Sequence, residues 1–377
     1  MEKFNEELFN ELLDEFVEKE VKPLAKEIDE EERFPMETVE KLAKLNFMGI
    51  IVPKEFGGAN GDYNMYITAV RKLSRACATT GVILSGHTSL CVSPILEFGT
   101  EEQIKKYIPK LAKGEALGAF ALTEPNAGTD AANQQTMAID MGDYFLLNGN
   151  KIFITNAGYA DVYIVFALTD RALGLKSMTG FIVEKGYEGF SVGKKEEKMG
   201  IRGSSTCELI FKDVKVPKEN LLGKVGEGFK IAMKTLDGGR IGIAAQALGI
   251  AEGAFEETVK YVKSRKQFNK PIAKFQNTQF TLADMKTRIE ASRLLVYQAA
   301  EAKMNKSKDL SLYAAMAKLY AAETASYVTN RAVQLFGGYG YTREYPVERM
   351  MRDAKITEIY EGTSEVQRMV ISGSVLK

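Results

Sequence analysis

Apolar residues repeat with a helical period in the first part of the chain. Near the N-terminus, the apolar positions spaced by three and four residues are Phe9, Leu12, Leu13, Phe16 and Val17. Such spacing places side chains on one face of a helix. Prolines and the glycine-rich loop 57–62 interrupt a helical pattern that extends to about residue 116. The pattern predicts an N-terminal α-helical domain over residues 1–116.

The middle of the chain has a different pattern. Residues 163–168, 180–184 and 208–216 are short runs rich in β-branched and aromatic side chains, which are typical of strands. Residues 139–144 and the pair Asn148-Gly149 have the composition of turns between such strands. We therefore predict a compact central β domain, a barrel or a sandwich, over residues 117–222.

From about residue 223 the helical period returns in two long stretches. The seam of the first is Leu282, Met285, Ile289, Ser292, Val296 and Ala299, and the seam of the second is Leu312, Ala315, Leu319, Ala322, Ser326, Thr329 and Val333. Long helices with such seams favour a helix bundle. We predict a C-terminal helix-bundle domain over residues 223–377, and an α+β fold with the β domain between two α-helical domains.

Bulk composition disfavours several classes of function. The 50 Lys and Arg balance the 50 Asp and Glu, so nothing favours nucleic acid or an anionic membrane as a partner. The acidic N-terminus lacks the basic start and apolar run of a signal peptide. The most apolar helical run, 241–251, is about half the roughly 20 residues that a membrane span needs. Three scattered cysteines suggest buried side chains rather than metal ligands or disulfides. We expect a cytoplasmic protein without a metal site.

The single histidine, His87, restricts the acid–base chemistry. Ser–His–Asp triads and most zinc or di-iron sites use histidine. An enzyme with this sequence would therefore use a carboxylate, a lysine or a tyrosine as its base. For His87 itself, a structural role or a place in a pocket wall is favoured over catalysis.

Glu361 is the candidate base. A helix predicted over 346–359 precedes it, and Ser364 and Gln367 have the spacing of a capping box for the next helix. Glu361 and Gly362 would then lie in a tight junction between two helices, where glycine allows the backbone to approach a ligand closely. A plain helix–helix connector would have a similar sequence.

Four other stretches have the composition of binding segments. Residues 120–130 join a strand to a loop whose hydroxyl and N–H groups suit a phosphate or a polar ring edge, although an ordinary turn would look similar. Residues 153–155 are compatible with a plain strand. The basic cluster 265–271 either stabilises a helix C-terminus or pairs with pyrophosphate. Residues 334–341 are a glycine-rich break after a helix, so they do not form a Rossmann fingerprint, which follows a strand.

Together these stretches resemble the acyl-CoA dehydrogenase family, and most closely its bacterial short-chain, butyryl-CoA dehydrogenases. The phrases that carry the resemblance are, in chain order, LTEPNAGTD, KIFITN, TLDGGRIGIAAQALGIAEGA, RKQFNKP, AVQLFGGYGY and MRDAKITEIYEGTSEVQ. They span nearly the whole chain. The resemblance implies the family's three-domain fold with a C-terminal four-helix bundle, one FAD per subunit and a homotetramer.

The resemblance also implies roles for individual residues. Glu361 matches the base that removes the α-proton, and burial beside a ligand would raise its pKa toward neutrality. The residues expected to contact FAD are Phe120, Leu122, Thr123, Gly128, Thr129, Phe153, Ile154, Thr155, Thr363 and Glu365. Those expected to hold the FAD of a neighbouring subunit are Arg265, Phe268, Gln276, Gln334, Leu335, Gly337 and Gly338. Those expected to contact the substrate are Thr129, Asp237, Gly238, Gly239, Arg240, Tyr360 and Gly362.

Three positions bear on how far the resemblance holds in detail. Phe153 stands where many relatives have Trp, but it keeps a flat ring for the flavin. Asn269 stands where relatives usually have Gly, and Asn tolerates positive φ, so the turn should be kept. Val92 and neighbouring residues of the segment 87–94 would form the floor of the acyl pocket.

The implied reaction is the α,β-dehydrogenation of a short acyl-CoA, butyryl-CoA to crotonyl-CoA. The α-proton would go to the base and the β-hydride to flavin, and an electron-transferring flavoprotein would take the electrons. Because this chemistry is reversible, a 2-enoyl-CoA reductase acting on crotonyl- or acryloyl-CoA in an electron-bifurcating complex stays open. An oxidase using O₂ and a non-catalytic acyl-CoA-binding member are lesser alternatives.

Overall fold

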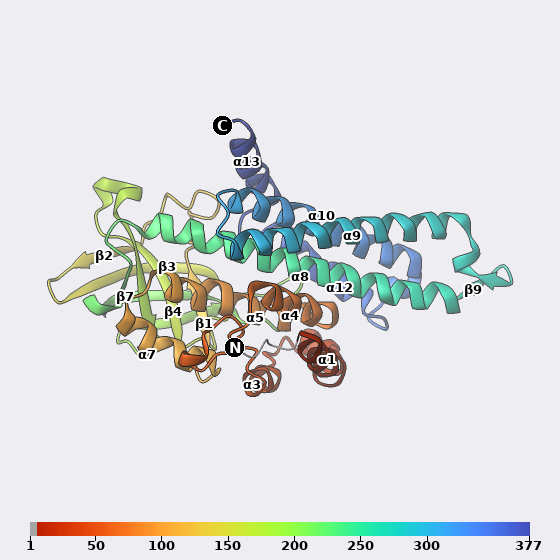
Figure 1. The fold of residues 1–377 in the computed structure, drawn as a ribbon, viewed down its shortest axis with the longest axis horizontal. Helices are drawn as coiled ribbons and strands as arrows, with labels where there is room; N and C mark the ends of the chain where they lie inside the picture. Colours follow the sequence, from red (N-terminus) through yellow and green to blue (C-terminus); the bar gives the residue numbers. More distant parts are fainter. Residues whose placement is uncertain (1–5) are drawn as a thin grey trace.

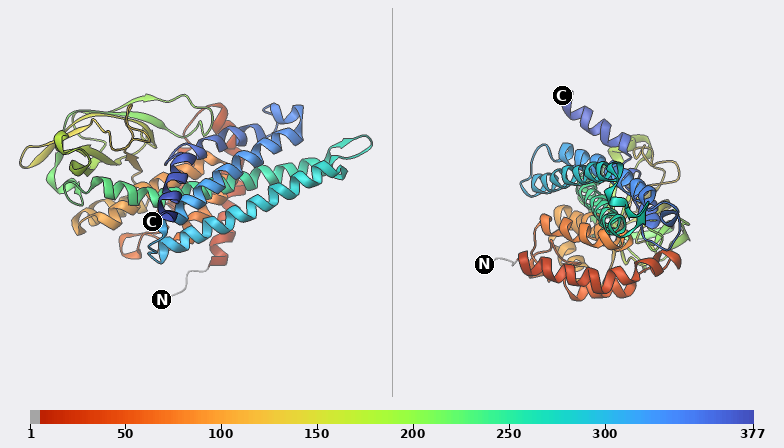
Figure 2. Two further views of the ribbon diagram at one scale, coloured as in Figure 1. Left: turned by 90° about the horizontal axis from the view of Figure 1, so that it is seen from above. Right: turned by 90° about the vertical axis from the view of Figure 1, so that its right-hand side faces the viewer.

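The computed structural model describes residues 6–377, so the first five residues of the predicted N-terminal domain lie outside the described part. Figure 1 shows the strands of the middle part gathered at one end of an elongated molecule and long helices reaching to the other end. The end-on view in Figure 2 shows the N-terminal helices as a layer on one side of the C-terminal helices. The predicted order of helical, β and helical parts is confirmed.

The N-terminal part is built from short helices. Its elements are α1 (Glu6–Phe16), a π-helical turn (Val17–Val21), a 3-10 turn (Lys22–Leu24), α2 (Ala25–Glu30), α3 (Met36–Lys44), a 3-10 turn (Lys54–Phe56), α4 (Tyr63–Ala76), α5 (Ala78–His87), a π-helical turn (Thr88–Val92), α6 (Ser93–Phe98) and α7 (Glu101–Ala112). Phe9, Leu13, Phe16 and Val17 of the predicted stripe are buried, while Leu12 at its edge is 38% exposed.

One apolar stretch of this part was missed in the sequence. Residues 78–98 form the one helical segment in the described part of the chain that is long and apolar enough to cross a membrane by length and composition alone. However, 78% of its most apolar window is buried inside the protein. A core helix has this pattern, because it packs against other helices on every side.

His87 lies in this buried stretch, and its hydrogen bonds confirm the structural role. Its Nε2–H donates to the Leu111 carbonyl at 3.2 Å, and its Nδ1 accepts from the Gly118 N–H at 3.1 Å. Burial lowers the pKa of His87 to about 4, so the ring is neutral near pH 7. The imidazole therefore ties α5 to α7 and β1.

The middle part is an eight-stranded sheet. Its strands are β1 (Gly118–Ala121), β2 (Met137–Asp140), β3 (Tyr144–Thr155), β4 (Val162–Leu168), β5 (Met178–Glu184), β6 (Phe190–Lys195), β7 (Thr206–Pro217) and β8 (Leu221–Leu222). The order is β6-β7-β3-β2-β4-β5-β8, and β1 pairs with β4 in parallel. The Ile152 N–H of β3 donates to the Thr123 carbonyl at 2.9 Å, and this hydrogen bond joins the loop after β1 to the last part of β3 at the site.

The prediction of a turn at Asn148-Gly149 is wrong. β3 continues through this pair with a register shift against β7, which is a β-bulge. Gly149 has φ 145°, and a Cβ there would lie 2.5 Å from Thr136 Oγ1 on the neighbouring segment. Asn-Gly is a strong hairpin signal in isolation, but here the glycine is required by close packing within a long strand. The predicted turn at 139–144 does join β2 to β3.

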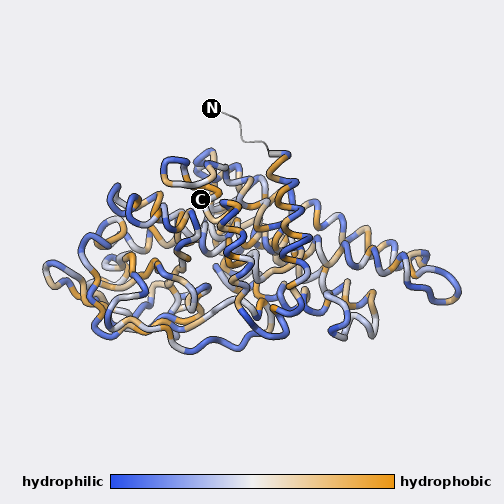
Figure 3. The backbone as a smooth tube through the Cα atoms, turned by 90° about the horizontal axis from the view of Figure 1, so that it is seen from below, coloured by the Kyte–Doolittle hydropathy of each residue, from blue (hydrophilic) through white to orange (hydrophobic). Residues whose placement is uncertain are grey.

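The C-terminal part contains three long helices and several short elements. They are α8 (Gly228–Ser264), β9 (Lys266–Gln267), β10 (Lys270–Pro271), a 3-10 turn (Ile272–Lys274), α9 (Gln276–Met304), α10 (Leu310–Phe336), α11 (Gly338–Tyr341), α12 (Val347–Lys355), a 3-10 turn (Ile356–Glu358) and α13 (Ser364–Val375). In Figure 3, hydrophobic and hydrophilic positions alternate along the long helices, as expected for helices with one buried face.

The predicted seams describe α9 better than α10. In α9, Leu282 is half-buried and the other five seam residues are buried. In α10, Leu312 and Leu319 are only half-buried, and the buried face extends to Ala314, Ala317 and Ala321. The predicted seam included Ala315 and Ala322, which are buried, but it left out the neighbouring alanines, whose small side chains extend the buried face of α10.

Candidate active site

A cavity of about 640 Å³ lies where the three parts of the chain meet. Its walls come from the loop after β1, the end of β3, the first half of α8 and the loop between α12 and α13. The predicted site residues among its lining are Phe120, Leu122, Thr123, Gly128, Thr129, Phe153, Ile154, Thr155, Arg240, Tyr360, Glu361, Gly362 and Thr363. The fold thus gathers most of the predicted flavin and substrate residues around one space.

The loop that carries Glu361 has an unusual backbone. The preceding 3-10 turn ends at Glu358, and then Glu361 and Gly362 have φ 56° and 93°. A left-handed conformation is costly for a glutamate, so the surrounding structure must hold it. The loop turns the side chain of Glu361 into the cavity, as the junction in the sequence had suggested.

The predicted capping box at this junction is wrong by one residue. Thr363 is the N-cap of α13, and its side chain accepts a hydrogen bond from the Val366 N–H at 3.3 Å. Gln367, which is buried, donates instead to the Gly362 and Glu361 carbonyls at 2.8 and 3.3 Å. A glutamine four residues after the cap reaches the loop rather than the cap, and here it holds the two left-handed residues.

The Glu361 carboxyl group is in a setting that favours its protonated form. Its Oε2 is buried and has no hydrogen-bond partner within the protein. Burial raises the pKa of Glu361 from its usual 4.5 to about 7, and the charges of Lys318 and Arg240 oppose this rise. A carboxylate with a pKa near neutrality can both take and release a proton at physiological pH.

Gly239 leaves room for this carboxyl group. A Cβ at position 239 would overlap Glu361 Oε2 and lie 2.9 Å from Glu361 Cδ and 2.8 Å from Leu90 Cδ2. No residue other than glycine is small enough at this point of α8 while Glu361 keeps its position. Glycine inside a helix is unfavourable by roughly 1 kcal/mol relative to alanine. Gly239 therefore lowers the stability of α8, and in return it leaves space for the Glu361 carboxyl group.

The other residues of the 237–240 segment have different positions from those predicted for substrate contacts. Only Arg240 lines the cavity. Asp237 accepts from Arg240 Nη1 at 2.8 Å and from Ser311 Oγ at 2.5 Å, and so it orients the arginine. The Gly238 carbonyl accepts from the Tyr63 hydroxyl at 2.8 Å.

A buried ion pair, which the sequence reasoning missed, holds the loop after β1. Lys151 is fully buried, and its Nζ donates to Glu124 Oε1 at 2.7 Å, to the Leu122 carbonyl at 3.0 Å and to Gln134 Oε1 at 3.2 Å. Burial lowers the pKa of Lys151 to about 8, and the charge of Glu124 opposes this effect. A lysine two residues before Phe153, within the apolar pattern of a strand, was the available signal.

Phe153 lies on a second bulge of β3. The register against β7 shifts between Lys151 and Ile154, and Phe153 has φ 58°. The bulge turns the ring outward, so that Phe153 is 59% exposed while Ile154 is buried. A large aromatic side chain held open at a strained position is suited to cover a flat ligand, and it borders the cavity.

The residues assigned to the FAD of a neighbouring subunit lie elsewhere. Arg265 and Phe268 belong to the β9–β10 hairpin at the tip of the long helices, far from the strands in Figure 1. Phe268 and Asn269 have φ 51° and 61°, which are the angles of a type I′ turn, so the turn expected at Asn269 is present. Gln276, Gln334, Gly337 and Gly338 are also exposed, and Leu335 is half-buried. None of the seven lines the cavity of their own chain.

Two further predicted residues lie outside the cavity. Val92 is fully buried and is not among the residues that line the cavity, whereas Leu90 lines it together with Gly86 and Val82. Leu90 belongs to the predicted segment 87–94, so within that segment Leu90 rather than Val92 borders the cavity. Glu365 is exposed on α13.

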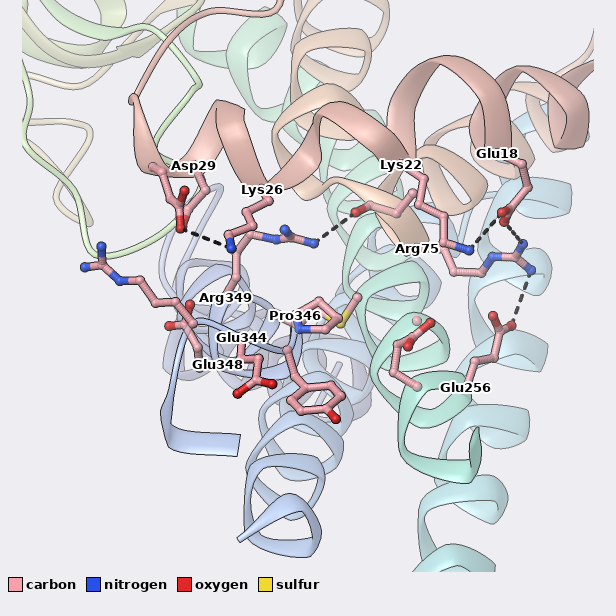
Figure 4. A pocket seen from close by; sticks show the side chains of 17 residues that line it. Glu18, Lys22, Lys26, Asp29, Arg75, Glu256, Glu344, Pro346, Glu348 and Arg349 are labelled. Atoms are coloured by element: carbon pink, nitrogen blue, oxygen red, sulfur yellow. Dashed lines mark hydrogen bonds and ion pairs between the residues drawn. The ribbon is translucent and has the colours of Figure 1, made fainter. Parts of the chain in front are cut away.

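A second cavity, of about 230 Å³, lies between the N-terminal helices and the end of α4, α8 and the start of α12. Figure 4 shows that its lining is mostly charged, with Arg75 between Glu18 and Glu256. Arg75 lies 3.7 and 3.3 Å from these two carboxylates, and Lys22 lies 2.8 Å from Glu18. These side chains neutralise one another, so we assign the chemistry to the larger cavity.

Three family models cover the chain in order. They are the acyl-CoA dehydrogenase N-terminal domain over residues 4–115, the middle domain over 119–214 and the C-terminal domain over 226–376. The chain belongs to the acyl-CoA dehydrogenase family. Acyl-CoA dehydrogenases are enzymes that bind FAD, and the cavity described above lies between the three matched regions.

Individual relatives of this acyl-CoA dehydrogenase are similar over their full lengths. The short-chain specific acyl-CoA dehydrogenase of Clostridium acetobutylicum is 61% identical over 99% of this chain and 98% of its own. The caffeyl-CoA reductase–Etf complex subunit CarC of Acetobacterium woodii is 49% identical over 98% of each chain. The solved butyryl-CoA dehydrogenase of Megasphaera elsdenii has a TM-score of 0.97 and 52% identity over all of both chains.

Proposed function

We propose that this protein is an FAD-dependent dehydrogenase of short-chain acyl-CoA thioesters, with butyryl-CoA as substrate and crotonyl-CoA as product. The observation that carries the proposal is the Glu361 carboxyl group, which faces the cavity with a pKa raised to about 7. In the reaction the Cα–H proton goes to Glu361, the Cβ–H leaves as hydride, and the Cα=Cβ double bond forms. FAD, when bound, supplies the hydride acceptor.

The lining of the cavity fits FAD. Phe153 offers an exposed ring at one wall, while Thr123, Thr129, Thr155 and Thr363 offer hydroxyl groups around it. Gly128 has open space in front of it, with no atom within 4 Å of where a Cβ would be. We assign the flavin to this wall and the acyl chain to the apolar side near Leu90. The backbone N–H of Glu361 would polarise the thioester carbonyl and so stabilise the charge that develops when the α-proton leaves.

We further propose that the active unit is a homotetramer. The exposed residues at the tip of the bundle, which include Arg265 and Gln334, cannot reach the cavity of their own chain and would hold the FAD of a neighbour. Removal of the guanidinium in Arg265→Ala should lower flavin content without changing the Glu361 pocket. The three free, buried cysteines fit a reducing compartment, and we keep the cytoplasm as the proposed location.

Anaerobic titration with butyryl-CoA tests the substrate and the reaction. We expect bleaching of the oxidised-flavin absorption band as butyryl-CoA is added. An oxidised-flavin spectrum that does not change when butyryl-CoA is added would rule out butyryl-CoA as substrate. Protein that retains no flavin after incubation with FAD would favour a non-catalytic member of the family.

The physiological direction has a second candidate, because the relative from Acetobacterium woodii is named as a reductase in an Etf complex. The same residues would serve a 2-enoyl-CoA reductase, with Glu361 returning the proton to Cα. We propose an electron-transferring flavoprotein as the redox partner in either direction. Turnover of crotonyl-CoA with NADH and that flavoprotein, compared with butyryl-CoA oxidation by the same mixture, distinguishes the two.

A further inference from the structure

A buried lysine lies behind the loop that carries Glu361. Lys318 is on α10 and is fully buried, although lysine rarely is. Its neighbours at three and four residues along the helix are all fully buried alanines, namely Ala314, Ala315, Ala321 and Ala322. These small side chains leave a channel through which the lysine stem can run. The ammonium group ends at the Gly362 carbonyl, to which it donates at 2.6 Å.

Two donors from different helices therefore meet at one carbonyl. Lys318 reaches Gly362 from α10, and Gln367 reaches it from α13 at 2.8 Å. Since Glu361 and Gly362 both have positive φ, the loop that they form needs such support to stay in one conformation, and the two donors hold it at the Gly362–Thr363 peptide. Gln367 provides the support without charge, whereas Lys318 adds a positive charge beside the base.

We infer that Lys318 is a positioning residue for proton transfer, which fixes the Gly362–Thr363 peptide next to Glu361 and, by its charge, favours the carboxylate form of Glu361 near neutral pH. The inference rests on the proposed role of Glu361 as base. The positive charge of Lys318 acts on Glu361 from the neighbouring carbonyl and lowers the pKa of that carboxyl group, which burial raises. Without the ammonium, burial alone would hold Glu361 protonated to a higher pH.

Few other charges face these groups. From α8, Arg240 faces Glu361, but Asp237 already neutralises it. The Tyr63, Tyr66 and Tyr360 hydroxyls also face Glu361, and burial raises the pKa of each so that they stay neutral. The charges of Arg240, Glu358 and Glu365 also act on Lys318, but Glu358 pairs with Lys355 and Glu365 is exposed. Of the two cations that act on Glu361, Arg240 has a carboxylate partner in Asp237, whereas the hydrogen bond that Lys318 donates is to a backbone carbonyl.

The test uses Lys318→Met, which keeps the length of the side chain and removes the charge and the donor. Gln367→Met removes the other donor to the same carbonyl without removing charge, and the exposed Lys308→Met controls for the substitution itself. Each holoenzyme is assayed for exchange of the α-protons of acetyl-CoA with D₂O across pH. Acetyl-CoA has α-protons but no β-carbon, so exchange measures the base without any oxidation.

We expect Lys318→Met to slow exchange at pH 7 and to move the acidic limb of the pH profile upward by about one pH unit. Gln367→Met should lower the rate without moving the limb, and Lys308→Met should match the wild type. An unmoved limb in Lys318→Met overturns the inference. If that variant does not retain flavin, Lys318→Gln, which keeps a donor and loses the charge, must show the same upward movement.

The experiment separates this inference from the proposed substrate. A wild-type enzyme that exchanges α-protons but whose flavin is not bleached by butyryl-CoA would overturn the substrate proposal. The comparison of Lys318→Met with the wild type could still be interpreted in that case. A wild-type enzyme that exchanges no α-proton would overturn the role of Glu361 as base and this inference with it.

Discussion

The contact between Gly239 and Glu361 makes a sharp prediction for Gly239→Ala. The added methyl group would overlap Oε2 and lie 2.9 Å from Cδ of Glu361, whereas carbon atoms pack at about 3.5–4.0 Å. The carboxyl group must then move by about 1 Å. A displacement of this size costs about 100-fold in rate when a reacting group must be in place, which corresponds to about 2.7 kcal/mol of activation free energy.

The fold should largely tolerate this change. Alanine improves the helix propensity of α8 by roughly 1 kcal/mol, and overpacking costs about 1–3 kcal/mol. The net loss in the free energy of unfolding should therefore be at most about 2 kcal/mol. This combination, a large loss of rate with a small loss of stability, distinguishes a displaced base from a damaged core.

Stopped-flow flavin reduction by butyryl-CoA, with thermal unfolding and flavin content measured in parallel, checks the prediction. Gly373→Ala is the matched control, since it also places alanine in a helix and meets no atom within 4 Å. We expect this control to keep the wild-type rate. A Gly239→Ala enzyme with near-wild-type kcat would refute the reasoning, because it would show that Glu361 works from a different position.

Three other predictions follow from the site. Glu361→Gln should keep flavin and lose about 10²–10⁴ of the rate of flavin reduction by butyryl-CoA. Because the folded-state pKa of Glu361 is raised to about 7, its contribution to stability is present below pH 4.5 and is lost as pH rises through 7. Over this pH range, chemical unfolding should therefore show the free energy of unfolding of Glu361→Gln rising relative to the wild type by at most about 3 kcal/mol. Lys151→Met should lower the free energy of unfolding by about 3–5 kcal/mol in urea, since it leaves the buried Glu124 without its partner, and adding Glu124→Gln should restore part of that loss. Phe153→Ala should weaken FAD retention in dialysis while leaving stability nearly unchanged, because the ring is 59% exposed, and an equal loss of both would contradict its assignment to the flavin.

Most of the architecture could be predicted because the spacing of apolar residues and the residue types found at turns depend on the local sequence alone. The strands at 163–168, 180–184 and 208–216 were identified to within two residues. The seam of α9 was identified for a similar reason, since large apolar residues recur at helical spacing. The errors occur where a tertiary contact decides, as at Gly149, whose need for small size comes from Thr136 on another segment.

The site was only partly open to prediction from the residues themselves. The position of Glu361 in a junction between helices followed from the flanking helix signals, and the resemblance named its partners around the cavity. The supporting residues Lys151 and Lys318 were missed, and Gln367 was predicted as part of a capping box rather than as a donor to the Glu361 loop. From the sequence, a lysine within an apolar pattern is predicted to lie at the solvent-exposed edge of a helix or strand. Its burial depends on a hydrogen-bond partner more than twenty residues away in the chain.

The two walls of the cavity share a physical design. Each presents a residue with positive φ that is not glycine, Phe153 on the flavin side and Glu361 on the proton side, and such conformations cost about 1–3 kcal/mol each. Behind each wall lies a fully buried lysine, Lys151 or Lys318, that donates to backbone carbonyls of the adjacent loop. Burial lowers the pKa of each lysine to about 8, and the charge of a glutamate opposes this effect, namely Glu124 for Lys151 and Glu361 for Lys318. Glu124 is a permanent partner, held by two backbone N–H groups. In the proposed reaction Glu361 would take up and release the substrate proton, so the charge that acts on Lys318 would change during turnover, and this difference makes Lys318 the more informative of the two to change.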